Sequence, residues 1–342
     1  MNKNNDFKIL SIDGGGIKGL YSAVILAAFE EKYGSIKDYF HLICGTSTGG
    51  IIALALAAGI PAKKIVDLYT NKGPLIFPYK RKSIRKIHWL KQTIIKSKYS
   101  DEILRQSLEE VFKEKKISDC QTMILIPTVN ITTGTPCVIK PDHYNPNYNR
   151  DNSHSLVEVA LSTAAAPTYF PVQKISTMPD PNYQFVDGGL WANNPSLLGI
   201  QEAYRHFINR EGYNYSNFSL LSISTLHQYF SYKKSLKQKS RSFFHWNSKL
   251  ISLIIDLQSI STHHHIQFLN ESLHGHYIRI ESEQLDENEK KIIDLDLATK
   301  KSIDLLVAKG EEASARWINK EELFYFFKKK KEIFTNESVG TV

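Results

Sequence analysis

The chain carries a serine framed by glycines, Gly45-Thr46-Ser47-Thr48-Gly49, between a predicted buried strand at residues 39–44 and a predicted helix from Ser47 onward. A strand, G-x-S-x-G and a helix in this order are typical of a nucleophile elbow, whose sharp turn exposes the serine hydroxyl. The helix N-terminus stabilises negative charge that develops there. The pattern therefore predicts that Ser47 is a nucleophile.

A second glycine cluster, Asp13-Gly14-Gly15-Gly16-Ile17-Lys18-Gly19, follows an apolar strand pattern at residues 7–12 and opens a predicted helix that runs to about Lys32. Parallel strands joined by crossover helices bring successive strand ends to the same edge of a sheet. We therefore expect this loop and Ser47 to face each other across one cleft. A serine nucleophile needs N–H donors for its oxyanion, which an all-glycine loop can supply.

Gly14, Gly16 and Gly19 also match the G-x-G-x-x-G pattern of dinucleotide-binding proteins. That pattern expects an acidic residue about 20 positions on, at the end of the second strand, where this chain has Cys44-Gly45-Thr46. A P-loop needs Ser or Thr directly after its lysine, and Gly19 follows Lys18 here. Both kinds of nucleotide site are disfavoured at this loop.

A candidate base for the serine is Asp187, which ends an apolar strand pattern at residues 183–186 and precedes Gly188-Gly189. An isolated Asp-Gly pair is usually a turn, but this is the third glycine-framed strand end in the chain. An aspartate with an ordinary pKa near 3.9 is a weak base. We therefore expect Asp187 to be poorly solvated, which raises its pKa, and to contact the Ser47 hydroxyl.

The three motifs, in this order, resemble those of the patatin-like phospholipase family. The segments at residues 164–171 and 190–195 resemble the family's sequences before and after the aspartate motif. The resemblance covers roughly residues 7–200 and becomes vaguer through 258–259 and 277–280. It implies an α/β fold, a three-layer sandwich with a central, mostly parallel sheet flanked by helices.

The resemblance also implies a phospholipase A-type acyl hydrolase that works through a Ser–Asp dyad and an acyl-enzyme, with no catalytic histidine and no metal. Ser47 would be the nucleophile and Asp187 the general base. The oxyanion hole would be formed by Gly14, Gly15 and Gly16, and the remaining motif glycines are Gly19, Gly45, Gly49, Gly188 and Gly189. Lys18 departs from the family, in which arginine is more usual, and a lysine lacks the planar fork of donors.

Within this family the chain is most similar to bacterial antiphage effectors that cyclic nucleotides activate. The resemblance implies a cyclic di- or trinucleotide activator, and a constitutive lipid acyl hydrolase is the alternative. A Ser–His–Asp esterase is a further alternative, with candidate histidines His227, His245, His263, His264 and His265. It is disfavoured because an α/β-hydrolase usually has several more strands before its elbow.

Length and composition agree with an intracellular enzyme. The 342 residues, 42% of them apolar, suit a single domain over residues 1–342, with a basic insert at 72–100 and a helical C-terminal region at 285–335. Three cysteines without metal-ligand spacing suit a reducing compartment. No signal peptide pattern follows Met1. The longest apolar run, at residues 51–60, is too short to cross a bilayer. We expect a cytoplasmic protein in peripheral contact with the inner membrane surface, and the oligomeric state stays open.

The net charge of +8 is concentrated in two segments. Residues 68–100 contain nine Lys or Arg residues and no Asp or Glu, and residues 212–255 contain six and none. Both segments interleave aromatic residues with the cations, which suits a membrane phospholipid surface or the phosphates of a nucleotide; the first segment is a candidate lid or membrane-binding surface. The basic pI also raises a nucleic-acid-binding protein as an alternative, but no zinc-finger spacing, RNP1-like signature or helix-turn-helix pattern supports it.

Overall fold

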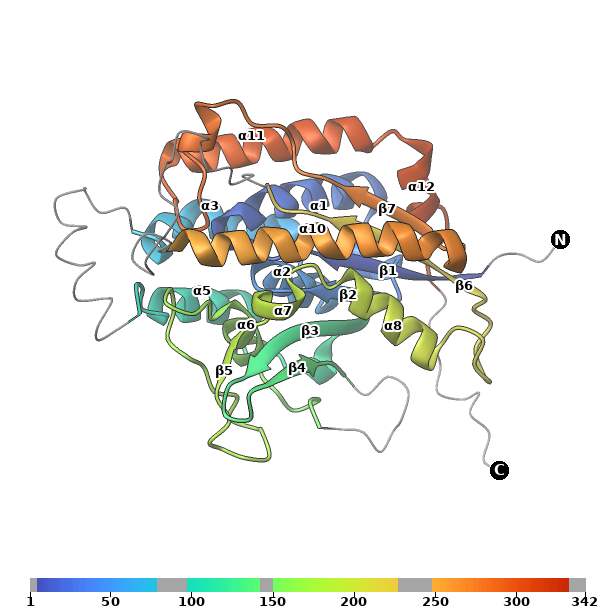
Figure 1. The fold of residues 1–342 in the computed structure, drawn as a ribbon, viewed down its shortest axis with the longest axis horizontal. Helices are drawn as coiled ribbons and strands as arrows, with labels where there is room; N and C mark the ends of the chain where they lie inside the picture. The colour runs from blue at the N-terminus through green and yellow to red at the C-terminus, as the bar shows by residue number, and fades with distance from the viewer. Residues whose placement is uncertain (1–4, 79–96, 142–149, 227–247, 332–342) are drawn as a thin grey trace, which may run out of the picture.

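The computed structural model describes residues 5–78, 97–141, 150–226 and 248–331. A seven-stranded sheet runs through the centre of the molecule, with helices on both faces (Figure 1). The strands are β1 (Asp6–Ile12), β2 (Leu42–Gly45), β3 (Met123–Asn130), β4 (Thr135–Ile139), β5 (Phe185–Asp187), β6 (Asn217–Ile223) and β7 (His276–Ile280). Their order is β4-β3-β2-β1-β6-β7, and β5 also pairs with β3. Four pairs are parallel and the two pairs that β3 makes with β4 and β5 are antiparallel, so the predicted mostly parallel α/β sandwich is confirmed.

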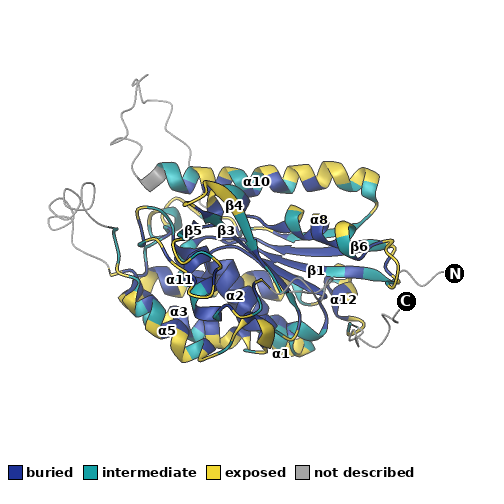
Figure 2. Ribbon diagram, turned by 90° about the horizontal axis from the view of Figure 1, so that it is seen from below, coloured by how far each residue is buried: buried dark blue, intermediate teal, exposed yellow. Residues whose placement is uncertain are grey.

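Two apolar cores lie on the two faces of this sheet (Figure 2). The larger core includes side chains of α1 (Gly19–Tyr33), α2 (Thr48–Ala57), α3 (Ala62–Ile76), α5 (Glu102–Phe112), α6 (Leu156–Ala164), α11 (Lys300–Trp317) and α12 (Glu321–Phe327). The other face is covered by α8 (Ser196–His206) and α10 (Ser248–Leu273), and the short α7 (Gly189–Ala192) contacts α10. Strands β1 and β2 read as apolar runs because both of their faces are covered.

The central strands β1 and β2 place the two N-terminal glycine motifs next to each other, at the same edge of the sheet. In the parallel pair β1/β2, Ile12 is the partner of Gly45, so the glycine loop and the serine turn leave the sheet side by side. A Cβ atom at Gly14 would lie 3.2 Å from the Cβ atom of Ser47. The expectation that the two loops face each other is confirmed.

The C-terminal region is only partly as expected. Residues 285–299 hold one short 3₁₀ turn, Glu289–Lys291, and regular helix begins with α11 at Lys300. Helix α12 is packed rather than frayed, because Leu323, Phe326 and Phe327 are buried. Within the described residues, the predicted helical region 285–335 therefore holds regular helix only at 300–317 and 321–327, while 332–335 lie outside them.

Most of the two basic segments lies outside the described residues, at 79–96 and 227–247, so the predictions of a lid or a membrane surface there stay predictions. Of the cations in the first segment that are described, Lys72 pairs with Glu110, and Lys98 pairs with Asp296. Among the described helices, none combines the length and hydropathy that crossing a bilayer requires.

Candidate active site

Ser47 occupies a strained turn between β2 and α2. Its φ of 55° and ψ of −124° lie outside the usual regions for a residue with a side chain, as backbone at functional sites often does. Its N–H donates to Thr163 Oγ1 at 3.0 Å, and that hydroxyl donates to the Pro127 carbonyl at 2.7 Å. The strained conformation is thus held by a buried hydrogen-bonded pair from α6 and β3.

Helix α2 approaches the end of β1 so closely that there is no room for a side chain at Gly49, in its first turn. A Cβ atom at Gly49 would lie 2.3 Å from the Ile12 carbonyl oxygen, which real structures do not tolerate. Glycine at this motif position therefore lets the helix N-terminus, with Ser47 as its N-cap, lie against the glycine loop.

The Ser47 Oγ donates a hydrogen bond to Asp187 Oδ2 at 2.7 Å, so the predicted contact is present. The other carboxylate oxygen accepts from the Gly189 N–H at 2.7 Å. Asp187 is only 4% exposed. Burial raises its pKa to about 6, although the hydrogen bonds from Gly189 and Ser47 act in the opposite direction. The poor solvation expected for this carboxylate is confirmed.

Asp187 reaches Ser47 by a route that parallel topology does not explain. Both β4 and β5 pair with residues 128–130 of β3, so they occupy opposite edges of that strand. Strand β2 pairs with residues 123–125, and β5 runs antiparallel farther along. Strand β2 runs parallel to β3 and β5 runs antiparallel to it, so the C-terminal ends of β2 and β5 point toward each other beside β3. Ser47 follows the end of β2, Asp187 ends β5, and the two side chains are in contact.

One of the three glycine amides predicted as oxyanion donors is engaged elsewhere in the structure. The Gly14 N–H donates to the Asn193 carbonyl at 3.0 Å, so this predicted oxyanion donor is already engaged. Gly15 and Gly16 line the same cavity as Ser47, and within the described chain neither of their amides makes a hydrogen bond that would compete. Gly16 has a φ of 57°, and its missing Cβ leaves room for the Leu295 carbonyl oxygen.

Three buried side chains that the sequence reasoning missed hold this arrangement. Asn193 Nδ2 donates to the Gly14 carbonyl at 3.2 Å and to Ser259 Oγ of α10 at 2.9 Å. Arg279 of β7 donates both guanidinium ends to Asp13, at 2.6 and 3.3 Å. Thr163 supports Ser47 as described above. Asn193 and Arg279 fall in segments that resemble the family, but nothing in their spacing indicated these contacts, and Thr163 gave no signal.

Lys18 is almost fully buried, and its Nζ lies 3.8 Å from Asp256 of α10. Its single ammonium group therefore makes a point contact where an arginine would offer a fork. With the Asn193–Ser259 bond and the hydrogen bond from Asn194 N–H to Gln258 Oε1, this ion pair holds α10 over the glycine loop.

The cavity at Ser47 is small and mostly apolar. It measures about 40 Å³ and is lined by Gly15, Gly16, Ser47, Phe77, Ala164, Ala166, Tyr169, Phe170, Asp187, Asn193, Ile251, Ile255 and Leu295. Among these described lining residues there is no histidine. His263 instead contacts the Tyr277 hydroxyl and Glu281, while His227 and His245 lie outside the described residues. The lining therefore favours the Ser–Asp pair over the Ser–His–Asp alternative.

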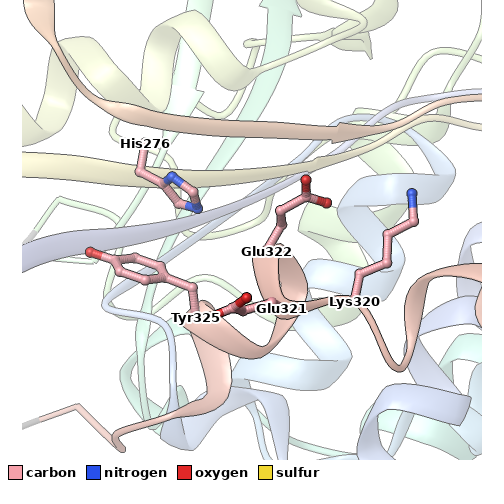
Figure 3. Close-up of a pocket in the computed structure, with 5 residues that line it drawn as sticks. All are labelled: His276, Lys320, Glu321, Glu322 and Tyr325. Atoms are coloured by element: carbon pink, nitrogen blue, oxygen red, sulfur yellow. The ribbon is translucent and has the colours of Figure 1, made fainter.

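A larger, open hollow of about 520 Å³ lies between β7 and α12 (Figure 3). It is lined by His276, Lys320, Glu321, Glu322 and Tyr325 and shares no residue with the Ser47 cavity. Two carboxylates at its wall disfavour an anionic ligand such as a nucleotide. Across the part of the chain that is described, no group of three or more His, Cys, Asp or Glu side chains is arranged to hold a metal ion.

Comparison with known proteins agrees with this site. The family model for patatin-like phospholipase matches residues 10–198. The chain is 31% identical to a protein of Escherichia coli (strain TW11681) named cGAMP-activated phospholipase, over 94% of this chain and 92% of that protein. A protein of the same name from Vibrio cholerae is 32% identical, over 95% of both chains. With this fold, these motifs and these relatives, the chain belongs to the patatin-like phospholipase family and is a phospholipase.

Proposed function

We propose that this phospholipase cleaves fatty-acyl esters of membrane phospholipids with Ser47 as nucleophile and Asp187 as general base, and that a cyclic nucleotide activates it. The observation that carries the dyad is the 2.7 Å hydrogen bond from Ser47 Oγ to Asp187 Oδ2 inside a buried, largely apolar cavity. Burial raises the pKa of Asp187 to about 6, which makes it a stronger base that is still ionised at neutral pH.

In the proposed first step, Asp187 takes the Ser47 proton while Oγ forms a bond to the ester carbonyl carbon. The carbonyl oxygen becomes an oxyanion, which the Gly15 and Gly16 amides and the N-terminus of α2 stabilise. The intermediate then expels the lysolipid oxygen, which receives the proton from Asp187, and leaves an acyl-enzyme on Ser47.

In the second step, a water molecule loses a proton to Asp187 and attacks the acyl carbon. The oxyanion forms again at the same amides. Its collapse breaks the bond to Ser47 Oγ, which takes the proton back from Asp187, and a free fatty acid leaves. The proposed reaction draws on no metal ion or other cofactor, so a chelator should leave turnover unchanged.

Activation by a cyclic nucleotide is supported by the names of the relatives, which are cGAMP-activated phospholipases. It is also supported by the size of the cavity. Its 40 Å³ is far below the roughly 300–1,000 Å³ of ordinary ligand pockets. An acyl chain therefore requires a rearrangement of the wall, and a nucleotide that favours the open arrangement would activate the enzyme.

The test compares the wild type with Ser47→Ala on phospholipid vesicles, with and without cGAMP. We expect the wild type to release fatty acid and lysolipid only with cGAMP, and Ser47→Ala to release neither. Ser118→Ala, the same change at an exposed serine, is the matched control and should behave as the wild type. Equal hydrolysis with and without cGAMP would instead support a constitutive enzyme, and an active Ser47→Ala variant would rule out the proposed nucleophile.

A further inference from the structure

Helix α10 has one face toward the catalytic cavity and another toward solvent. On the inner face, Ile251 and Ile255 line the cavity, Asp256 pairs with Lys18, and Ser259 holds Asn193. The helix spans 26 residues, or about 39 Å at 1.5 Å per residue. Figure 2 shows it lying along the outside of the molecule with exposed residues on its outer side. A surface that binds this outer side is therefore separated from the Ser47 cavity by α10.

The outer face carries apolar and uncharged polar side chains up to Leu269, and the exposed carboxylate of Glu271 follows near the C-terminal end of the helix. Exposed residues recur at three- and four-residue spacing, as one helical face requires, and they are Ile254, Leu257, Ser261, His264, His265, Gln267, Phe268 and Leu269. The only Asp, Glu, Lys or Arg between residues 250 and 270 is Asp256, which is buried. An ordinary solvent-exposed helix face is charged or polar. This one leaves Phe268 74% and Leu257 54% exposed.

The two helices that contact α10 also carry exposed apolar side chains. Leu190 of α7 and Leu197 of α8 are also exposed. Six of the eleven exposed large apolar side chains in the described part of the chain thus lie on these three helices: Leu190, Leu197, Ile254, Leu257, Phe268 and Leu269. Such a concentration marks an interaction surface, whereas single exposed apolar residues do not.

We propose that this outer face of α10, with Leu190 and Leu197, docks on the surface of a phospholipid bilayer. This inference rests on the proposed function, because a phospholipase must meet its substrate in a bilayer. An amphipathic helix lies in the membrane interface with its apolar residues buried among the headgroups. Among the exposed residues of α10 the only carboxylate is Glu271, which lies near the C-terminal end of the helix, so the stretch from Ile254 to Leu269 can enter the interface without burying a full charge. Docking there places the bilayer against α10, and residues on the inner side of this helix line the Ser47 cavity.

The test measures co-sedimentation with vesicles of phosphatidylethanolamine and phosphatidylglycerol. The parent is full-length Ser47→Ala, so that lipid hydrolysis does not change the vesicles, and cGAMP is present throughout. The docking variant adds Leu257→Ser and Phe268→Ser. The matched control adds Ile131→Ser and Phe324→Ser, which replace one aliphatic and one phenylalanine side chain that are 42% and 49% exposed on other elements.

We expect the docking variant to bind vesicles at least about tenfold more weakly than the parent, and the control to bind as the parent does. Equal binding by the docking variant, or no binding by the parent, would overturn the proposal. A shift of the docking variant from dimer to monomer in size-exclusion chromatography, with vesicle binding unchanged, would also overturn it and make this face an interface between copies.

A second measurement separates this proposal from the proposed function. With Ser47 intact, the docking variant should hydrolyse a soluble short-chain ester as the wild type does and lose hydrolysis of vesicle lipid. Equal loss on both substrates would mean that the substitutions damage the enzyme itself and would overturn docking as their cause. If the wild type releases no fatty acid at all, the proposed function fails, and the sedimentation result still decides the docking surface.

Discussion

Helices α2 and α10 both border Ser47, the proposed nucleophile, and they are built in opposite ways. Every residue of α2 is buried, and its first turn approaches the β1 backbone through glycine. Helix α10 is more than twice as long, and it contacts the site through polar side chains and through Ile251 and Ile255, while an entire face stays exposed.

This difference matches two separate requirements of the enzyme, a fixed position for the nucleophile and a way for the lipid to enter. The nucleophile needs its position fixed to a fraction of an ångström, and a buried helix with no room to shift provides that. Entry of a lipid needs a wall that can move, and α10, which is exposed along one face, has more room to move than the fully buried α2.

The largest effect is expected at the carboxylate that contacts the elbow. Asp187→Asn keeps the shape of the side chain but removes its capacity to take a proton, so we expect kcat to fall at least about 10³-fold. Asp304→Asn, at an exposed position on α11, is the matched control and should keep wild-type turnover. An Asp187→Asn enzyme within tenfold of the wild type would show that another group is the base.

The pH dependence should report the same carboxylate. Because burial raises the pKa of Asp187 to about 6 and the base must be ionised, kcat/KM on a soluble ester should be flat above pH 7. It should fall about tenfold per pH unit below 6. Circular dichroism at each pH would show that the fold persists. A profile that stays flat down to pH 5 would contradict the assignment.

The rigid part of the site was predictable because its requirements are local. Glycines that allow close backbone approach, a serine before an apolar helix and an aspartate at a strand end all leave marks in the sequence at short range. Ser47 and Asp187 could therefore be paired in advance, although they lie 140 residues apart along the chain.

The other features of the structure depend on contacts between distant segments, which no short-range sequence pattern indicates. The engagement of the Gly14 amide by Asn193 and the clamp of Arg279 on Asp13 join segments about 180 and 266 residues apart, and ordinary polar residues make them. The antiparallel direction of β5 depends on how β3 extends beyond β2. The exposed face of α10 was missed because its apolar residues look like core residues until the packing shows which face is covered.

A smaller effect should distinguish the packing of the two helices. Gly49→Ala in α2 introduces a Cβ atom against the Ile12 carbonyl, so we expect the free energy of unfolding in urea to fall by about 1–3 kcal/mol. Ser261→Ala on the exposed face of α10 is the comparison and should change it by less than about 0.5 kcal/mol. If Gly49→Ala is as stable as the wild type, the close approach of α2 to β1 is not a constraint.

The smallest effect tests whether α10 takes part in the site as well as covering it. Ser259→Ala removes the oxygen that accepts from Asn193 Nδ2, which leaves that buried amide only its 3.2 Å bond to the Gly14 carbonyl. One such hydrogen bond contributes about 1 kcal/mol, so kcat/KM on a soluble ester should fall up to about fivefold, with Ser261→Ala unchanged. A drop in kcat/KM that exceeds the loss of stability would mean that α10 positions the glycine loop through Asn193. Unchanged kcat/KM would mean that the loop keeps its geometry without the hydrogen bond from Asn193 to Ser259.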